Sequence, residues 1–270
     1  MSLNLVFLLH RSSLLLHPFL PSFPVYFPVG PFRLHPHLVM EVIAYAVGLY
    51  ITLFRRRHSE SSGISPSQRS SVAVGALVGA LLGAKLLVMF QHVYLLGQDW
   101  RLFLQVLLQG KTIVGALLGG LIGVEVTKKL IGLRRSTGDS FVYSVLWGTA
   151  IGRVGCFLTG LSDRTYGIAT SLPWGVDFGD GIARHPTQLY EIGFLLLLFV
   201  ILRGYERRLR REGDLFKFYM IAYLSFRLFV DFIKPEFRPL LGLSAIQIAC
   251  VGGLLYYAKP LMRMVRLWRY

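Results

Sequence analysis

Two arginines lie inside apolar segments, where a charged side chain is costly. Arg153 stands near the end of one such segment, and Arg227 lies well inside another. A charge at the centre of a bilayer costs roughly 2.5–3.5 kcal/mol on insertion scales, so each arginine is a candidate for function. The planar guanidinium group binds phosphate through two parallel hydrogen bonds. The two arginines therefore predict a site for an anion, and a phosphate group suits them best.

Tyr223 and Asp231 stand one helical turn before and after Arg227, on the same face of a predicted helix. Asp231 can orient the Arg227 guanidinium group toward a ligand. In the alternative interpretation, Arg227 and Asp231 form a self-contained ion pair with a structural role. Two further charges at membrane depth, Lys85 and Glu125, either pair with each other or leave Glu125 near the cytoplasmic end of its segment.

The composition places these residues in a membrane. Of the 270 residues, 54% are hydrophobic and 16% are charged, whereas an ordinary soluble domain has about 25% charged residues. The mean hydropathy is +0.55. These values exclude a cytosolic globular enzyme and a disordered chain. The net charge of +15 falls in short clusters between apolar runs rather than on one hydrophilic face, so we expect no nucleic-acid partner.

We predict an all-α polytopic membrane protein with about seven transmembrane helices. A helix of roughly 20 apolar residues crosses the hydrocarbon core of a bilayer. The segment 100–109 is apolar but too short to span, and its length is typical of an interfacial or re-entrant helix. The segments that qualify as spans are 34–54, 71–94, 112–131, 140–160, 187–203, 215–234 and 242–258.

Basic clusters predict the orientation of these spans. They follow the first, third, fifth and seventh segments, and the alternate connections are poor in Lys and Arg. Because basic residues favour the cytoplasmic side, the N-terminus is expected outside and the C-terminus in the cytoplasm. The domains predicted are an apolar, proline-rich extension (1–33), a seven-helix membrane domain (34–258) and a basic cytoplasmic tail (259–270).

Glycines recur at every fourth position in the second and third predicted spans. This spacing places them on one face of each helix and allows two backbones to approach closely. We therefore predict that the two spans pack against each other. The glycines concerned are Gly75, Gly79, Gly83, Gly115, Gly119 and Gly123.

Several motifs resemble those of the prolipoprotein diacylglyceryl transferase family. Gly152-Arg153-Val154-Gly155-Cys156-Phe157 resembles the Gly-Arg-x-Gly-Asn-Phe signature of that family. Arg184-His185-Pro186-Thr187-Gln188-Leu189-Tyr190-Glu191 resembles its Arg-His-Pro-Ser-Gln-Leu-Tyr-Glu block. Tyr223, Arg227 and Asp231 match a Tyr-x3-Arg-x3-acidic pattern. Leu243-Ser244-x-x-Gln247 resembles the opening of the last span, and Gly119-Gly120-Leu121-Ile122-Gly123 resembles the glycine-rich third span. The resemblance covers residues 34–258 in the right order.

The resemblance implies a multi-pass enzyme of the bacterial plasma (inner) membrane, with its active site toward the outer face. Such an enzyme transfers the diacylglyceryl group of phosphatidylglycerol to the lipobox cysteine thiol in the signal peptide of a preprolipoprotein. It implies catalytic roles for Arg153, Arg227, His185, Asp231 and Tyr223. It implies phosphatidylglycerol binding by Arg153, Arg184, Gln188, Tyr190, Glu191 and Arg227. The sequence shows no cluster with metal-ligand spacing and no nucleotide-binding loop, so we expect no cofactor.

The chain departs from the family pattern at several positions. Val114 stands at the position of a family His that is a proposed base, and Cys156 stands at the Asn of the signature. A family acidic residue becomes Leu161 unless Asp163 serves in its place, and an aromatic pair becomes Pro36-His37. The general base is therefore open among His185, His37 and Asp231, and His185 has the alternative role of capping a turn. We interpret Cys156 as a small buried side chain rather than a nucleophile, and Cys250 as a packing residue.

Two alternative functions remain open from the sequence. One is a non-catalytic homologue that binds an anionic membrane lipid. The other is a small anion transporter that binds its substrate through the buried arginines. A transporter predicts inverted repeats with paired broken helices, and the sequence contains no convincing internal repeat.

Overall fold

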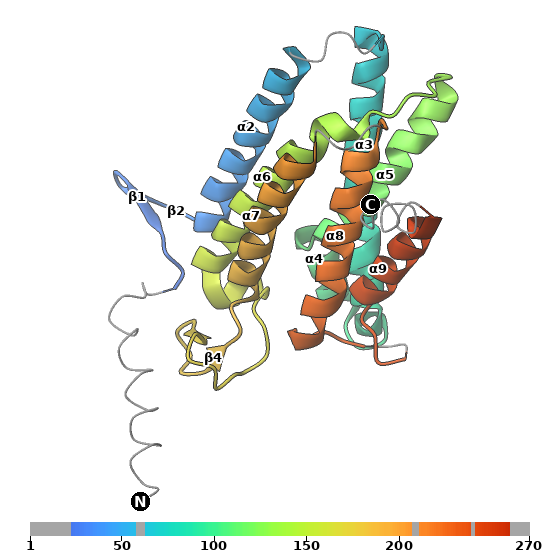
Figure 1. The fold of residues 1–270 in the computed structure, drawn as a ribbon. Coiled ribbons are helices and arrows are strands. Elements are labelled where there is room, and N and C mark those ends of the chain that lie inside the picture. The colour runs from blue at the N-terminus through green and yellow to red at the C-terminus, as the bar shows by residue number, and fades with distance from the viewer. Residues whose placement is uncertain (1–22, 58–62, 207–210, 239–240, 260–270) are drawn as a thin grey trace, which may run out of the picture. The chain divides into compact units, whose positions relative to one another are not determined.

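The chain is mostly helical (Figure 1). The computed structural model describes residues 23–57, 63–206, 211–238 and 241–259. The chain forms two compact units. Unit 1 is drawn from Met1–Val47, Trp147–Leu196 and Ile233–Pro235, and unit 2 from Gly48–Leu146, Leu197–Phe232 and Glu236–Tyr270. Most of the extension predicted at 1–33 and almost all of the tail at 259–270 lie outside the described residues.

Helices occupy each of the seven predicted spans. They are α2 (Pro36–Arg57), α3 (Pro66–Gln91), α5 (Ile113–Leu130), α6 (Val142–Thr159), α7 (Thr187–Tyr205), α8 (Asp214–Val230) and α9 (Ala245–Tyr256). The short helix α4 (Trp100–Gln109) precedes α5, and single turns of 3-10 helix are η2 (Val93–Gly97), η3 (Gly138–Phe141), η4 (Gly160–Asp163) and η6 (Asp231–Ile233). Two antiparallel hairpins complete the described elements: β1 (Phe27–Val29) with β2 (Phe32–Leu34), and β3 (Val176–Asp177) with β4 (Ala183–Arg184).

Four helical segments are long and apolar enough to cross a membrane: Pro36–Arg55, Pro66–Gln91, Gly138–Asp163 and Thr187–Tyr205. Helices α4 and α5 are bent by 67° relative to each other and count as a fifth span if they form one broken element. Helix α8 has only 17 residues and α9 only 12, so neither meets the length of a full span. The described chain thus has four or five candidate spans, and the number seven stays a prediction.

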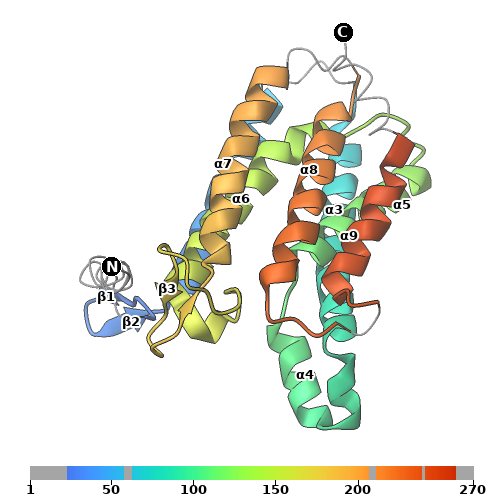
Figure 2. The ribbon, with the colours of Figure 1, turned by 60° about the horizontal axis from the view of Figure 1, so that its bottom comes forward.

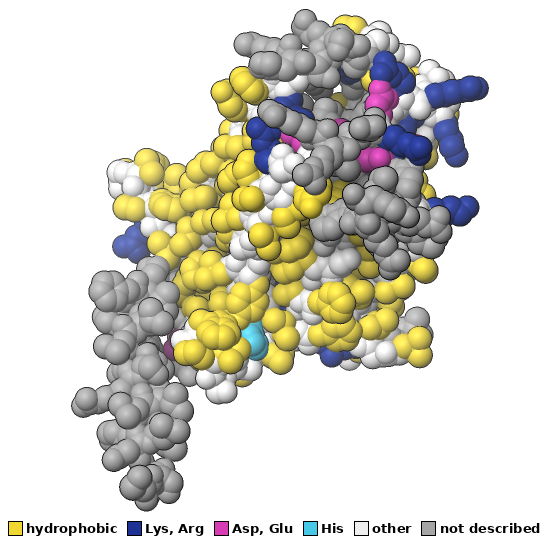
Figure 3. All heavy atoms as spheres, in the orientation of Figure 1, with side chains coloured by type: hydrophobic (Ala, Val, Ile, Leu, Met, Phe, Trp, Pro, Cys, Tyr) yellow, Lys and Arg dark blue, Asp and Glu magenta, His cyan; other side chains and the backbone are white. Residues whose placement is uncertain are grey.

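Exposed apolar side chains cover the long helices. Leu77 and Leu81 on α3 are 62% and 60% exposed, and Leu197 and Val200 on α7 are 60% and 65% exposed. Hydrophobic side chains dominate the face drawn in Figure 3. Monomeric soluble proteins rarely expose large contiguous apolar patches, and so many exposed apolar side chains fit a surface in contact with lipid.

Helices α3 and α5 of unit 2 pack backbone against backbone and lie side by side in both ribbon views (Figures 1 and 2). A Cβ atom on Gly79 would meet the carbonyl of Gly119, and one on Gly83 would meet that of Gly115. A Cβ atom on Gly123 would likewise meet the carbonyl of Gly75. The packing predicted from the glycine spacing is therefore confirmed, since only glycine permits this approach.

Lys85 and Glu125 do not pair with each other, contrary to one of the two interpretations above. The Lys85 ammonium group donates to the carbonyl oxygens of Leu107, Leu108 and Gly110 at 3.0, 2.7 and 2.9 Å. Glu125 instead pairs with Lys128 at 2.8 Å. The carbonyls at a helix C-terminus lack intrahelical partners and attract a cation. Lys85 therefore stabilises the end of α4, at the bend before α5.

Candidate active site

Arg153 and Glu191 form a buried ion pair in unit 1. Arg153 lies on α6, Glu191 lies one turn into α7, and their Nε and Oε2 atoms are 2.9 Å apart. The two side chains are only 8% and 2% exposed. A buried charge requires a partner of opposite sign. The fold thus brings together the two most distinctive motifs of the sequence, the glycine-arginine signature and the Arg184–Glu191 block.

Hydrogen bonds from Gln188 and Thr187 connect the start of α7 to the segment that follows α6. The Gln188 amide nitrogen donates to the Thr165 hydroxyl at 3.1 Å, and the Thr187 hydroxyl donates to the Thr165 carbonyl at 2.5 Å. The Thr165 hydroxyl in turn donates to Asp163 Oδ2 at 2.7 Å. This chain of donors orients the Gln188 amide. Its oxygen Oε1 is buried and has no hydrogen-bond partner among the described residues.

His185 and Tyr190 contact each other rather than Arg153. The Nδ1 atom of His185 lies 3.1 Å from the Tyr190 hydroxyl, which also accepts a hydrogen bond from the Trp174 indole at 2.8 Å. The backbone of His185 pairs with Gly167 and Ile168. His185 is thus built into the loop by its backbone and by Nδ1, and its role as a base stays a prediction.

Arg184 is engaged within its own loop. Its two terminal nitrogens donate to both carboxylate oxygens of Asp180 at 2.6 and 2.7 Å, and its guanidinium carbon lies 5.0 Å from the ring centre of Tyr166. The hydrogen bonds from Arg184 hold the pKa of the Asp180 carboxyl below its usual range. Arg184 therefore clamps the loop in this structure, and its predicted contact with phosphatidylglycerol remains a hypothesis.

Arg227 belongs to unit 2 and lies on α8 with Tyr223, both almost fully buried. Its Nη2 atom is 3.5 Å from Oδ1 of Asp231, which opens η6. The other carboxylate oxygen of Asp231 accepts a hydrogen bond from the Ser244 hydroxyl. The predicted stripe Tyr223–Arg227–Asp231 therefore lies inside unit 2, with Asp231 held from both sides.

Ser244 connects this stripe to the start of α9. Its hydroxyl accepts a hydrogen bond from the Gln247 backbone, and the Gln247 side chain accepts from the Ser244 backbone, which is a reciprocal capping box. Gln247 also donates to the Leu228 carbonyl at 3.1 Å. The sequence motifs did not predict the contact between Ser244 and Asp231. The Ser-x-x-Gln spacing predicts that a helix begins at residue 245, and this is the feature of the sequence that could have pointed to Ser244.

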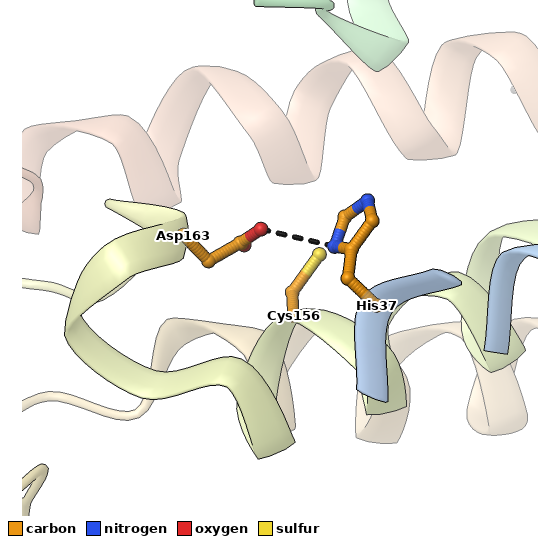
Figure 4. A group of neighbouring side chains, drawn as sticks. All are labelled: His37, Cys156 and Asp163. Atoms are coloured by element: carbon orange, nitrogen blue, oxygen red, sulfur yellow. Dashed lines mark ion pairs between the residues drawn. The ribbon is translucent and has the colours of Figure 1, made fainter. Parts of the chain in front are cut away.

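A third group in unit 1 consists of His37, Cys156 and Asp163, from α2, α6 and η4 (Figure 4). One potential ligand atom from each residue lies within 4.8 Å of the other two, and His37 Nδ1 is 3.0 Å from Asp163 Oδ1. Cys156 is buried, whereas the side chains of His37 and Asp163 are 29% and 12% exposed. A His, a Cys and an Asp are suitable ligands for a metal ion. Sequence spacing missed this group because His37 is distant from the other two in the chain.

Comparisons with known proteins agree with the motifs. A model of the prolipoprotein diacylglyceryl transferase family matches residues 24–262. A phosphatidylglycerol–prolipoprotein diacylglyceryl transferase of Bordetella parapertussis is 31% identical over 261 residues, which is 88% of this chain and 96% of the relative. The protein of the same name from Methylobacillus flagellatus is 32% identical over 247 residues, 85% and 90% of the two chains. That from Coxiella burnetii is 30% identical over 234 residues, 82% and 85% of the two chains.

Proposed function

The chain belongs to the prolipoprotein diacylglyceryl transferase family, and we propose that it transfers the diacylglyceryl group of phosphatidylglycerol to a lipobox cysteine of preprolipoproteins. In this reaction the cysteine sulfur forms a bond to C3 of the diacylated glycerol. The bond from that carbon to the phosphate oxygen breaks, and the oxygen takes the electron pair as glycerol phosphate leaves. The thiol proton is lost to water or to a base. The reaction is the first step of lipoprotein maturation.

The buried arginines are the observation that carries this proposal. Arg153 and Arg227 each lie in a family motif, each beside a carboxylate at 2.9 and 3.5 Å. The carboxylates fix the guanidinium groups in an apolar interior, where an ordered cation stabilises a developing anion most strongly. In the proposed reaction these two arginines bind the phosphate and stabilise the negative charge on the leaving group.

Gln188 supports recognition of the lipid headgroup. Its amide nitrogen is already used by Thr165, so the buried oxygen Oε1 is oriented and ready to accept. The glycerol headgroup of phosphatidylglycerol carries hydroxyl groups that can donate to it. An anionic lipid without a hydroxylated headgroup would leave this oxygen unsatisfied, which costs about 1–3 kcal/mol. Gln188 is therefore proposed to favour phosphatidylglycerol.

The seven-span topology, with its outside N-terminus and outward-facing site, is part of the proposal. It is supported by contacts in unit 2 among the ends of the predicted spans. Glu206, directly after α7, accepts hydrogen bonds from Arg55 at 2.6 Å and from Tyr143 at 3.0 Å. Glu212, before α8, pairs with Arg135. Arg55 at the end of α2 and Arg135 after α5 thus each pair with a carboxylate of the α7–α8 connection, as expected if these ends lie on the same, cytoplasmic side.

The decisive experiment is rescue of a bacterial strain depleted of its own transferase. We expect the parent chain to restore growth and diacylglyceryl modification of lipoproteins. Arg227→Ala is expected to lose this ability, because removing one donor to a developing anion typically lowers a rate 100- to 1,000-fold. Arg203→Ala is the matched control, since Arg203 is 59% exposed and pairs with Glu206 at the opposite end of α7 from Glu191.

Failure of the parent chain to modify any lipoprotein, at an expression level comparable to that of the resident enzyme, contradicts the proposal. It would favour the alternative of a homologue that binds an anionic lipid without transferring it.

A further inference from the structure

We propose that His37, Cys156 and Asp163 form a zinc site, and that the fourth position of the ion binds the substrate cysteine as a thiolate. The inference deepens the proposed function and rests on it, since it supplies the activation that the attacking thiol needs. A free cysteine has a pKa of about 8.5, so little of it is nucleophilic near neutral pH. The position that resembles the family's proposed base is the buried Val114, which cannot accept a proton.

The three potential ligand atoms converge on one point (Figure 4). In a tetrahedral zinc site with bonds of about 2.0–2.3 Å, ligand atoms are separated by roughly 3.3–3.8 Å. Here all three lie within 4.8 Å of one another, and His37 Nδ1 and Asp163 Oδ1 are 3.0 Å apart. Shifts of about an ångström or less close this set around an ion. Three protein ligands with one open position are typical of zinc sites that act on a substrate.

Neighbouring residues contact two of the three ligands, His37 and Asp163, at the atom that would not face the ion. Glu41 lies 3.7 Å from His37 Nε2, an ion-pair distance at which its carboxylate favours a proton on that second nitrogen and leaves Nδ1 for the ion. Thr165 donates to Asp163 Oδ2, which leaves Oδ1 turned to His37. His37 Nδ1 is itself buried and makes no hydrogen bond of good geometry in the described part of the chain, despite its nearness to Asp163. These supports are those expected around metal ligands.

The same geometry argues against a Cys-His-Asp nucleophile. In such a triad the two ring nitrogens of the His have separate tasks, because one contacts the nucleophile and the other the carboxylate. Here one nitrogen, Nδ1, faces Asp163, and Figure 4 shows the Cys156 sulfur beside that same nitrogen. The other nitrogen is directed to Glu41. Convergence of all three residues on one point is the arrangement of a metal site.

The charges around the ion are balanced before the substrate binds. The Cys156 thiolate and the Asp163 carboxylate together neutralise Zn²⁺, and Arg153 is paired with Glu191. A substrate thiolate therefore adds one negative charge, and the Arg153 Nη1 atom, which donates to the Cys156 sulfur at 3.7 Å, stabilises the sulfur ligands as a hydrogen-bond donor. A thiol bound to zinc loses its proton outright, and we assign that proton to water. The thiolate then attacks C3 of the lipid beside Arg153, the proposed ligand of the phosphate.

The first test measures metal binding by the purified full-length chain in detergent. We expect about one zinc per chain, and a cobalt-loaded protein with a near-ultraviolet thiolate-to-cobalt absorption band. Cys156→Ser should lose this band, whereas Cys250→Ser should retain it, since Cys250 is also buried but lies on α9, outside this group. Thermal unfolding of both variants in the same detergent confirms that they are folded. A parent protein that binds no more cobalt than Cys156→Ser overturns the proposal.

The second test uses a lipobox peptide with the cobalt-loaded protein. A peptide with Cys should increase the absorption band roughly twofold, because two thiolates then bind the ion, and the same peptide with Ser should leave it unchanged. An unchanged band with the Cys peptide overturns the thiolate assignment.

Transfer is measured in parallel, so that the two proposals fail separately. Full transfer by chelator-treated, metal-free protein overturns the zinc site and retains the transferase. A thiol-responsive metal site without any transfer retains the site and contradicts the proposed function.

Discussion

Glu191 offers the sharpest single perturbation of the site. Its carboxylate lies 2.9 Å from Arg153 Nε, and the two side chains are 2% and 8% exposed. With an effective dielectric constant of about 20, Coulomb's law gives roughly 6 kcal/mol of attraction at this distance. The cost of removing both groups from water offsets much of it, but removing one partner leaves a buried charge and typically costs about 3–5 kcal/mol. We therefore expect Glu191→Gln to be strongly destabilising.

Thermal unfolding in detergent measures this cost. For a chain of this size, 3–5 kcal/mol corresponds to a fall in melting temperature of roughly 6–20 °C. The control is Glu125→Gln. The Glu125 carboxylate is 44% exposed, so its ion pair with Lys128 should contribute less than about 1 kcal/mol to the free energy of unfolding.

The double variant Arg153→Met, Glu191→Met separates stability from function. Replacing a buried ion pair by apolar side chains is often neutral or stabilising, so we expect its melting temperature to return close to that of the parent. Its transferase activity should nevertheless be absent, because the proposed phosphate ligand is gone. A Glu191→Gln protein that melts with the parent and transfers at the parent rate would refute the reasoning about this pair.

Four further predictions concern the packing of α3, α4 and α5 and the loop that contains Asp180 and Arg184. Gly119→Leu should prevent α3 and α5 from packing, because any Cβ atom at this position meets the backbone of the facing helix. Folded protein should then fail to accumulate, which is measured as loss of the monodisperse peak in gel filtration. Lys85→Met should lower the melting temperature by an amount equivalent to about 1.5–3 kcal/mol, because Lys85 donates to carbonyls at the end of α4. Lys129→Met is the control, because Lys129 is exposed on α5, and it should leave the melting temperature unchanged. If Arg184 clamps the loop through Asp180, Asp180→Asn and Arg184→Gln should have equal and non-additive effects on transferase activity and on protease cleavage of the loop. A larger loss of activity for Arg184→Gln would instead indicate that Arg184 contacts the lipid directly. Because Arg184 lowers the pKa of Asp180, the loop's resistance to protease should be constant above the ordinary carboxyl pKa of about 3.9 and decline as the pH falls through the lowered value.

Hydropathy and spacing predicted the helices but not their lengths. Each apolar segment contains a helix, and the glycine spacing identified the packed pair α3–α5. Hydropathy does not identify the first and last residues of a helix. Helix α9 begins three residues later than predicted, directly after the N-cap residue Ser244. The two hairpins also escaped prediction, since strands of two or three residues have no periodicity to detect.

The sequence predicts the partner of a site residue best when the residue type and its position allow one plausible interaction. A buried arginine needs a counter-charge, and both Arg153 and Arg227 have one. Which carboxylate pairs with Arg153 was not predictable from spacing, because Glu191 comes from another helix. Arg184 shows the converse difficulty, since an arginine in a polar loop has many possible partners and Asp180 in its own loop is the one it contacts.

The group of His37, Cys156 and Asp163 was beyond any spacing rule. The sequence indicated a separate role for each member: a possible base for His37, packing for Cys156, and the place of the family's acidic residue for Asp163. Their convergence depends on the packing of α2 against α6 within unit 1, where a Cβ on Gly155 would contact Met40 and His37. Only tertiary structure brings such a set together, because its members have no metal-ligand spacing in the sequence.

The most direct test of the central claim is transfer by the purified chain in vesicles. The substrates are phosphatidylglycerol and a lipobox peptide, with phosphatidylethanolamine and a Cys→Ser peptide as controls. The account predicts a peptide with a thioether-linked diacylglyceryl group, identified by mass spectrometry, and one glycerol phosphate released for each. Arg227→Ala should reduce this rate at least about 100-fold. Absence of the thioether product with the parent chain, or full activity of Arg227→Ala, would contradict the account.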